Sequence, residues 1–153
     1  MRHAERAAEL FVQGYSCAQA VFGAFTDITG MDFDLAMRLS APFGAGMGRM
    51  REVCGACSAM FMVVGAVAGY SEADAAQKAA HYELIQELAN RFKERNGTLI
   101  CRELLQGLKT DTRPVPDART AEYYKARPCL RFVTDAADIL DNWLTERKAE
   151  CTE

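Results

Sequence analysis

The chain has 153 residues and a formal net charge of −3, and half of its residues are hydrophobic. A chain of this length can bury a core of its own, so we expect one domain over residues 1–147 and a frayed tail at 148–153. The acidic balance argues against nucleic acid or an anionic membrane as the main partner. The N-terminal residues show no secretory apolar run, so we expect a cytoplasmic protein whose six cysteines are reduced thiols, metal ligands or a cycling disulfide.

The first forty residues predict three helices. Ser16 and Asp32 are residue types that cap helix N-termini, while Gly14 and Pro42 are types that end helices. Apolar residues between these points recur at helical spacing. The expected helices cover residues 2–13, 17–28 and 33–39.

The segment from Val53 to Ser71 carries no charged residue and approaches the ~20 residues that a membrane-spanning helix needs. It is rich in Gly, Ala, Ser and Cys, and ordinary soluble helix sequence flanks it. We therefore expect no membrane span but a buried central helix that begins at about Cys54. Gly65 and Gly69 are spaced so that another helix can approach closely, which leaves a homodimer open.

The second half of the chain also predicts helices. Ser71 and Asp74 resemble a capping box that opens a long helix, and this helix is expected to stop at Asn96-Gly97. Residues 110–128 contain three prolines and are expected to be mostly loop. The remaining expected helices cover about 72–95, 101–108 and 129–147, with one turn near 119–124. The predicted fold is an all-α compact bundle of about six or seven helices.

Four cysteines stand where expected helices begin, namely Cys17, Cys54, Cys101 and Cys129. The unpaired N–H groups and the dipole of a helix start favour an anion, so a cysteine there tends towards the thiolate. Apolar residues follow each cysteine at helical offsets, which directs the sulfur towards the core. If these helix starts gather, the four sulfurs converge in a partly buried, electropositive pocket. The alternative for any one of them is that it packs as a small hydrophobic residue.

A glycine-rich run from Gly44 to Gly48 precedes the central helix. It is not a P-loop, because no Lys-Ser or Lys-Thr follows it, and no strand precedes it as in a dinucleotide site. One interpretation is a flexible backbone cradle in which Gly46 and Gly48 bind a cofactor while Arg49 and Arg51 attract an anion. The other is a tight connection packed against a helix.

The chain resembles the C-GCAxxG-C-C family of redox-active proteins. The resemblance rests on Cys17 after Gly14-Tyr15-Ser16, on Cys54-Gly55-Ala56 after the glycine-rich run, and on the later Cys101 and Cys129. It implies a small helical protein with redox-active thiols that are candidate cluster ligands. Ala59 stands where the family has a closing glycine, and Cys57 occupies a variable position.

Cys57 creates a Cys-x-x-Cys pair with Cys54. At a helix start this pair lowers the pKa of the first thiol and places a resolving thiol one turn away. The first mechanism is therefore thiol/disulfide exchange, with Cys54 as the nucleophile and Cys57 or another hallmark cysteine as the resolving thiol.

Two other mechanisms use all four cysteines, Cys17, Cys54, Cys101 and Cys129, as ligands. In one, the four thiolates hold an iron–sulfur cluster. In the other they hold structural zinc, which is less favoured because the chain has only one closely spaced pair of cysteines. The partner is an unidentified redox protein or small-molecule substrate, and whether the chain is an enzyme stays open. The alternative is a non-catalytic helical module with buried or structural metal-binding cysteines. His81 is expected in the core, and Cys151 is expected to be an exposed bystander.

Overall fold

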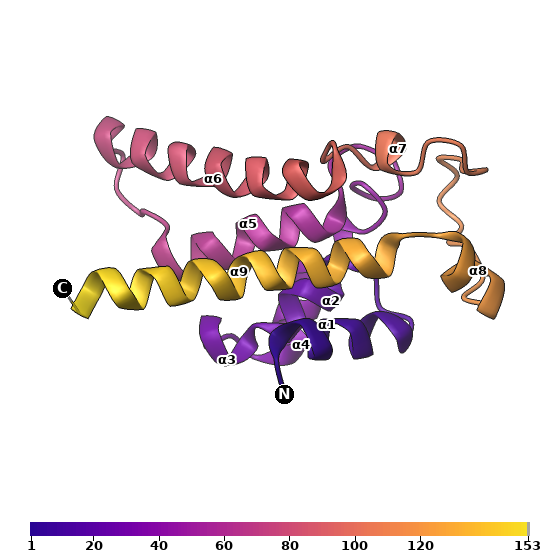
Figure 1. Cartoon of the computed structure of the whole chain (residues 1–153), viewed down its shortest axis with the longest axis horizontal. Helices are drawn as coiled ribbons and strands as arrows, with labels where there is room; N and C mark the ends of the chain where they lie inside the picture. The colour runs from indigo at the N-terminus through magenta and orange to yellow at the C-terminus, as the bar shows by residue number, and fades with distance from the viewer. Residues whose placement is uncertain (153) are drawn as a thin grey trace.

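The computed structural model describes residues 1–152, which form helices joined by loops (Figure 1). These residues contain nine α-helices, one 3₁₀ helix and no strand, so the expected all-α class is confirmed. The helices are α1 (His3–Val12), α2 (Cys17–Ala24), α3 (Thr26–Thr29), α4 (Phe33–Ser40), η1 (Ala41–Phe43), α5 (Gly55–Ala68), α6 (Ala75–Asn96), α7 (Cys101–Leu104), α8 (Ala121–Ala126) and α9 (Cys129–Thr152).

Helix α5 is the buried central helix that the sequence predicts. It contacts α2, α6 and α9, and Figure 1 shows it between α6 and α9. It approaches α2 closely at Gly55, where a Cβ atom would lie 2.5 Å from the Cys17 sulfur. A Cβ at Gly65 would have no atom within 4 Å in the described chain, so the close helix approach expected there is not found.

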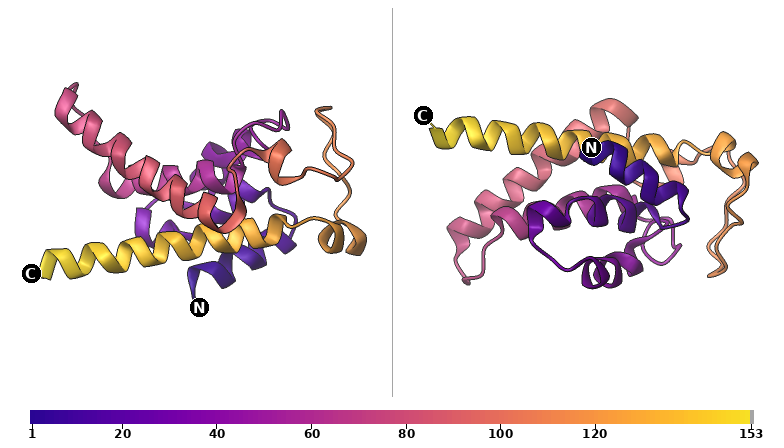
Figure 2. Two further views of the ribbon diagram at one scale, coloured as in Figure 1. Left: turned by 45° about the horizontal axis from the view of Figure 1, so that its top comes forward. Right: turned by 90° about the horizontal axis from the view of Figure 1, so that it is seen from below.

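The long helix α9 extends along the molecule and packs against helices from both halves of the sequence. It contacts α1, α2, α5 and α6, and in both views of Figure 2 its C-terminal end reaches slightly past the start of α6. The sequence places its end near Arg147, whereas it continues to Thr152, so residues 148–152 of the expected frayed tail are helical. The core beneath it includes Phe11, Leu88 and Leu140, all nearly fully buried.

Two of the three predicted N-caps are confirmed. The Ser16 hydroxyl accepts from the Gln19 amide at 3.2 Å, and Asp32 accepts from the Leu35 amide at 3.1 Å. The cap predicted at Ser71 is wrong, because Asp74 caps α6 by accepting from the Gln77 amide at 2.9 Å. A carboxylate is an effective N-cap acceptor, so the helix begins three residues later than predicted.

Two other helix boundaries differ from the sequence prediction. The helix expected over residues 17–28 ends at Ala24, and the separate turn α3 follows. The helix expected over 101–108 is the single turn α7.

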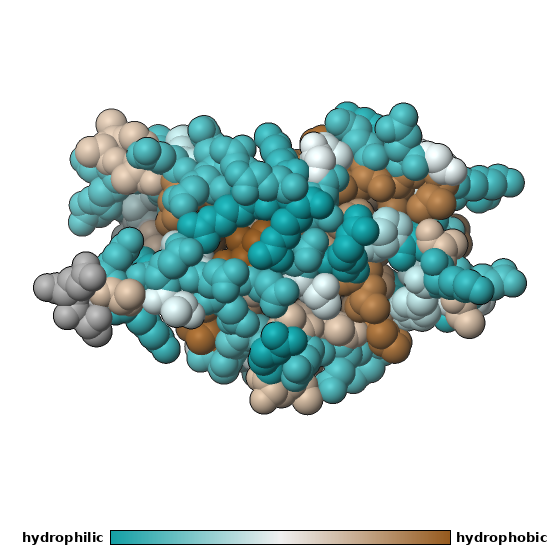
Figure 3. Space-filling model, viewed as in Figure 1, coloured by the Kyte–Doolittle hydropathy of each residue, from teal (hydrophilic) through white to brown (hydrophobic). Residues whose placement is uncertain are grey.

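No helix within residues 1–152 is both long and apolar enough to cross a membrane. The face viewed in Figure 1 is largely hydrophilic, and hydrophobic residues show more towards the end that holds α7 and α8 (Figure 3). That end also carries the N-terminal starts of α5 and α9, where the candidate site lies.

Candidate functional site

The four hallmark cysteines line one cavity of about 450 Å³. Cys17, Cys101 and Cys129 are the first residues of α2, α7 and α9, and Cys54 directly precedes α5. Four helix starts from distant parts of the sequence therefore meet at one end of the bundle. Cys57 is fully buried in the first turn of α5 and does not line this cavity, but its thiol helps to raise the pKa of Cys54.

Backbone pairing holds Cys54 beside Cys101. The Cys54 amide donates to the Leu99 carbonyl at 2.7 Å, and the Cys101 amide donates to the Glu52 carbonyl at 2.6 Å. The two bonds surround the isolated bridge between Val53 and Ile100. This short pairing of extended backbone brings α7 to the start of α5.

The glycine-rich run forms a left-handed turn that supplies another wall of the cavity. Residues 45–49 and Arg51 all have positive φ, including the non-glycine residues Ala45 and Met47 at 52° and 68°. Such φ values cost roughly 1–2 kcal/mol for each non-glycine residue, so surrounding contacts must hold the segment. Backbone bonds do so, among them Glu52 N–H to the Gly46 carbonyl at 2.9 Å.

The two glycines expected to bind a cofactor have different positions. Gly48 lines the cavity, whereas Gly46 is buried and does not. A Cβ atom at Gly46 would lie 2.6 Å from the Arg51 Cα, so this glycine allows the turn to close on itself. The structure thus supports the tight-connection interpretation for Gly46.

Burial reverses the thiolate tendency that we expected from the helix starts. It raises the pKa of Cys17 and of Cys129 to about 12, and the neighbouring cysteines add to the effect. A hydrogen bond with Cys57 and burial raise the pKa of Cys54 well above its ordinary value, although the Ala56 and Cys57 amides act against this. Burial also raises the pKa of Cys101 against the opposing influence of Arg51. The cavity therefore favours the neutral form of each of these thiols.

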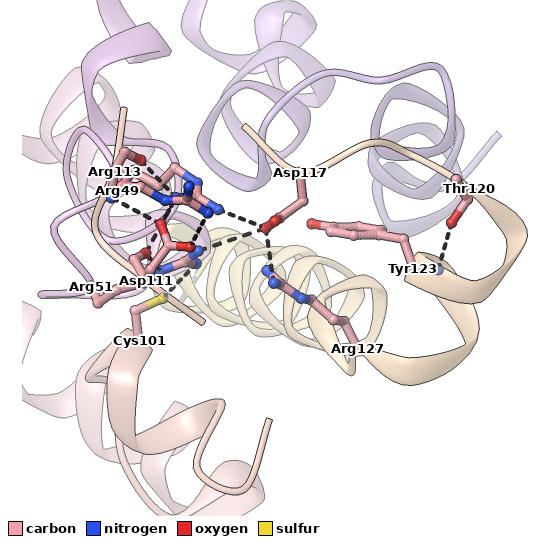
Figure 4. A network of polar contacts seen from close by, with 9 residues as sticks. All are labelled: Arg49, Arg51, Cys101, Asp111, Arg113, Asp117, Thr120, Tyr123 and Arg127. Carbon is pink, nitrogen blue, oxygen red and sulfur yellow. Dashed lines mark hydrogen bonds and ion pairs between the residues drawn. The ribbon is translucent and has the colours of Figure 1, made fainter. Parts of the chain in front are cut away.

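Arginines line the same cavity as the four sulfurs, and Figure 4 shows the polar contacts of Arg49, Arg51 and Arg127. Arg49 is buried and donates to the carbonyls of Asp111 and Arg113 and to the carboxylates of Asp111 and Asp117, at 2.6–3.2 Å. Partial burial acts to raise the pKa of Asp117, but Arg49 and Arg127 outweigh it and the pKa is lowered. The pKa of Asp111 is well below its ordinary value because Arg113 and Arg49 stabilise its carboxylate.

These contacts hold the proline-rich loop between α7 and α8 over the cavity. Pro114 and Pro116 of this loop and Tyr123 of α8 line the cavity. Arg119 donates to the Phe11 carbonyl at 2.9 Å and to the Tyr15 carbonyl at 3.0 Å, and its guanidinium lies over the Phe11 ring. Sequence reasoning missed the contributions of Asp117, Arg119 and Arg127, because loop charges carry no periodicity that indicates their partners.

The remaining candidates lie elsewhere. His81 is half-buried against Tyr70, with ring centroids 5.7 Å apart, and Cys151 is exposed on α9. In the part of the chain that the structure describes, no three His, Cys, Asp or Glu side chains are placed to hold one metal ion. The four sulfurs share a cavity without forming a preformed single-ion site of the kind that structural zinc occupies.

The family model described as "Putative redox-active protein (C_GCAxxG_C_C)" matches residues 15–143. The chain belongs to this family. The match contains all four cavity-lining cysteines and the Cys57 position. Searches among curated proteins and among solved structures find no match to this member of the C_GCAxxG_C_C family.

Proposed function

We propose that this protein is a thiol redox protein that reduces a small disulfide with the Cys54 and Cys57 thiols. The observation that carries the proposal is the placement of these two thiols at the start of α5, with Cys54 on the cavity wall and Cys57 buried three residues later in the first turn. Membership of a redox-active family supports the class of chemistry.

The reaction proceeds in two exchange steps. The Cys54 thiol loses its proton and its sulfur attacks one sulfur of the disulfide, which forms a mixed disulfide and releases the other half as a thiol. The Cys57 sulfur then attacks the Cys54 sulfur, loses its own proton and releases the second half. The substrate gains two electrons and two protons, and the protein is left with a disulfide between Cys54 and Cys57.

The surroundings of Cys54 fit this sequence. The Ala56 and Cys57 amides and the start of α5 stabilise negative charge on the Cys54 sulfur as its proton leaves. Burial favours the neutral form of the Cys54 thiol and raises its pKa, so these backbone amides act against that effect. Cys57 is fully buried, so its thiol reacts with the Cys54 sulfur rather than with disulfides in solution.

A second candidate function is electron transfer through an iron–sulfur cluster, favoured by the convergence of four cysteines on one cavity. Cys17, Cys54, Cys101 and Cys129 would hold the cluster, and thiolates are the donors that such clusters use. The adjacent arginines would offset its negative charge. When bound, the cluster would supply one-electron transfer.

Reaction with 4,4′-dithiodipyridine under anaerobic conditions tests the proposed exchange. The experiment uses the metal-free Cys151→Ser protein, because the exposed Cys151 thiol would itself release a thiopyridone. This protein is expected to release two thiopyridones rapidly and to end with an internal disulfide. In the same background, Cys54→Ser should abolish the rapid phase, and Cys57→Ser should stop after one thiopyridone with a mixed disulfide on Cys54. The wild-type protein is the matched control and should release one thiopyridone more, since Cys151 does not line the cavity.

Equal effects of Cys54→Ser and Cys151→Ser would overturn the site assignment. Iron and acid-labile sulfide in stoichiometric amounts after anaerobic purification, lost on Cys101→Ser or Cys129→Ser, would favour the cluster over exchange.

A further inference from the structure

Arg51 is a buried cation with an unpaired hydrogen-bond donor. It is 4% exposed, and its Nη2 atom is buried without a hydrogen-bond partner among the described residues. Its Nε donates to the Asp111 carbonyl at 3.1 Å, and its Nη1 lies 3.9 Å from the Cys101 sulfur, a weak acceptor. Buried guanidinium groups normally bind acceptors through most of their N–H groups, so Nη2 indicates a place for a further acceptor.

The nearest carboxylate does not fill that place. Asp117 lies 3.8 Å from Arg51 Nη2, which is beyond hydrogen-bond distance. Its Oδ2 atom already accepts from Arg49 at 2.9 Å and from Arg127 at 2.8 Å. One carboxylate oxygen is thus shared among three guanidinium groups, as the centre of Figure 4 shows.

The charge of the cavity wall is unbalanced. Four arginines line it, Arg49, Arg51, Arg119 and Arg127, with Asp117 as the one carboxylate among the described lining residues. Arg49 and Arg119 are engaged with backbone carbonyls. In the described part of the chain, Arg51 has no carboxylate within hydrogen-bond distance, and Arg127 has its one ion pair through Nη2 to the Asp117 oxygen that Arg49 shares. Both arginines line the cavity beside Asp117.

The other lining residues indicate the chemical character of the rest of the ligand. Phe11, Leu104, Leu105 and Phe132 line the cavity together with two prolines, so most of a ligand would lie against apolar groups. A volume of about 450 Å³ suits a small organic molecule. The neighbouring Asp117 and the apolar wall disfavour a dianion such as phosphate, whereas a carboxylate carries one charge and matches the planar fork of arginine.

We propose that the cavity binds a small organic carboxylate whose head group pairs with Arg51 Nη2 and Arg127 and whose apolar body lies against Phe11 and Leu105. Only one part of this inference rests on the proposed function, namely that the carboxylate belongs to the disulfide substrate. The head group at Arg51 would place the body of the substrate beside Cys54 and Cys101. Binding itself requires no redox step.

Calorimetric titration of the reduced, metal-free full-length protein with benzoate tests the proposal. Benzoate contains neither a thiol nor a disulfide, and benzyl alcohol is its neutral analogue of similar shape. Benzoate is expected to bind at least tenfold more tightly than benzyl alcohol, and Arg51→Gln should weaken benzoate binding at least tenfold. Arg38→Gln, which removes an exposed arginine of α4, should leave binding unchanged.

Three results would overturn the proposal. These are equal affinity for benzoate and benzyl alcohol, equal effects of Arg51→Gln and Arg38→Gln, or tighter binding of inorganic phosphate than of benzoate. If circular dichroism shows that Arg51→Gln does not fold, Arg127→Gln must meet the same tenfold criterion. The dithiodipyridine reaction of the same preparations reports the thiols separately, so failure of carboxylate binding and failure of thiol exchange are distinguishable.

Discussion

Cys17 and Cys129 show how burial competes with a helix start in setting the pKa of a thiol. Both are first residues of helices, where backbone N–H groups favour the thiolate. The Ala45 and Ala18 amides do act on Cys17 in that direction. Removal from water and the neighbouring thiols nevertheless raise the pKa of both cysteines to about 12. A helix start alone is therefore not evidence for a reactive thiolate.

Alkylation of these two thiols by iodoacetamide should be slow and should accelerate with pH far beyond neutrality. Because only the thiolate reacts, the rate should rise about tenfold per pH unit between pH 8 and 11 for a thiol whose pKa is about 12. Mass spectrometry of tryptic peptides gives the rate at each cysteine.

Urea-unfolded protein is the control, and its cysteines should reach a plateau near pH 9 to 10 because their pKa returns to roughly 8.5. Circular dichroism at each pH shows that the fold persists during the measurement. A plateau near pH 9 for Cys17 and Cys129 in the folded protein would contradict their raised pKa.

At the scale of elements, the loop between α7 and α8 covers the site because Arg49 holds it. The Arg49 side chain is 8% exposed and bonds four acceptor atoms on residues 111, 113 and 117 of that loop. The left-handed turn of residues 45–51 directs both Arg49 and Arg51 towards the loop. The strained turn and the loop thus stabilise each other.

Arg49→Gln should lower the free energy of unfolding by about 3 kcal/mol, because it leaves two loop carbonyls without their buried donor and removes one of the guanidinium groups that pair with Asp117. It should also increase proteolytic cleavage within residues 109–120. Urea titration and limited proteolysis measure the two effects. Arg113→Gln removes the other partner of Asp111, but its side chain is 81% exposed, so a loss below about 0.5 kcal/mol is expected. Similar losses for the two variants would show that Arg49 does not hold the loop.

The sequence predicts elements better than it predicts the cavity. The caps at Ser16 and Asp32 follow from neighbouring residues alone, because a cap bonds an amide three positions away. The contact between Arg49 and Asp117 joins positions 68 residues apart across two irregular segments, and no local pattern encodes it. Burial of the thiols depends on the same tertiary arrangement, so the direction of their pKa shifts could not be predicted either.

At the scale of the whole molecule, the bundle brings together four helix starts that are far apart in the sequence. Gly55 allows α2 to pack closely on α5, and the pairing of residues 52–54 with 99–101 brings α7 to the same end. Helix α9 contacts both α2 and α5, and it begins with Cys129 at this same end of the bundle. The result is a cavity that contains cysteines and arginines and is covered by one loop.

If Cys54 and Cys57 are the redox pair of this cavity, as proposed, they should be the first thiols to join. Peptide mapping by mass spectrometry, after brief oxidation of the reduced, metal-free protein with a small disulfide, identifies the first disulfide. We expect a disulfide between Cys54 and Cys57 that forms first and is reversed by dithiothreitol, while Cys17, Cys101 and Cys129 remain free thiols. A first disulfide that excludes Cys54, or oxidation confined to Cys151, would contradict it.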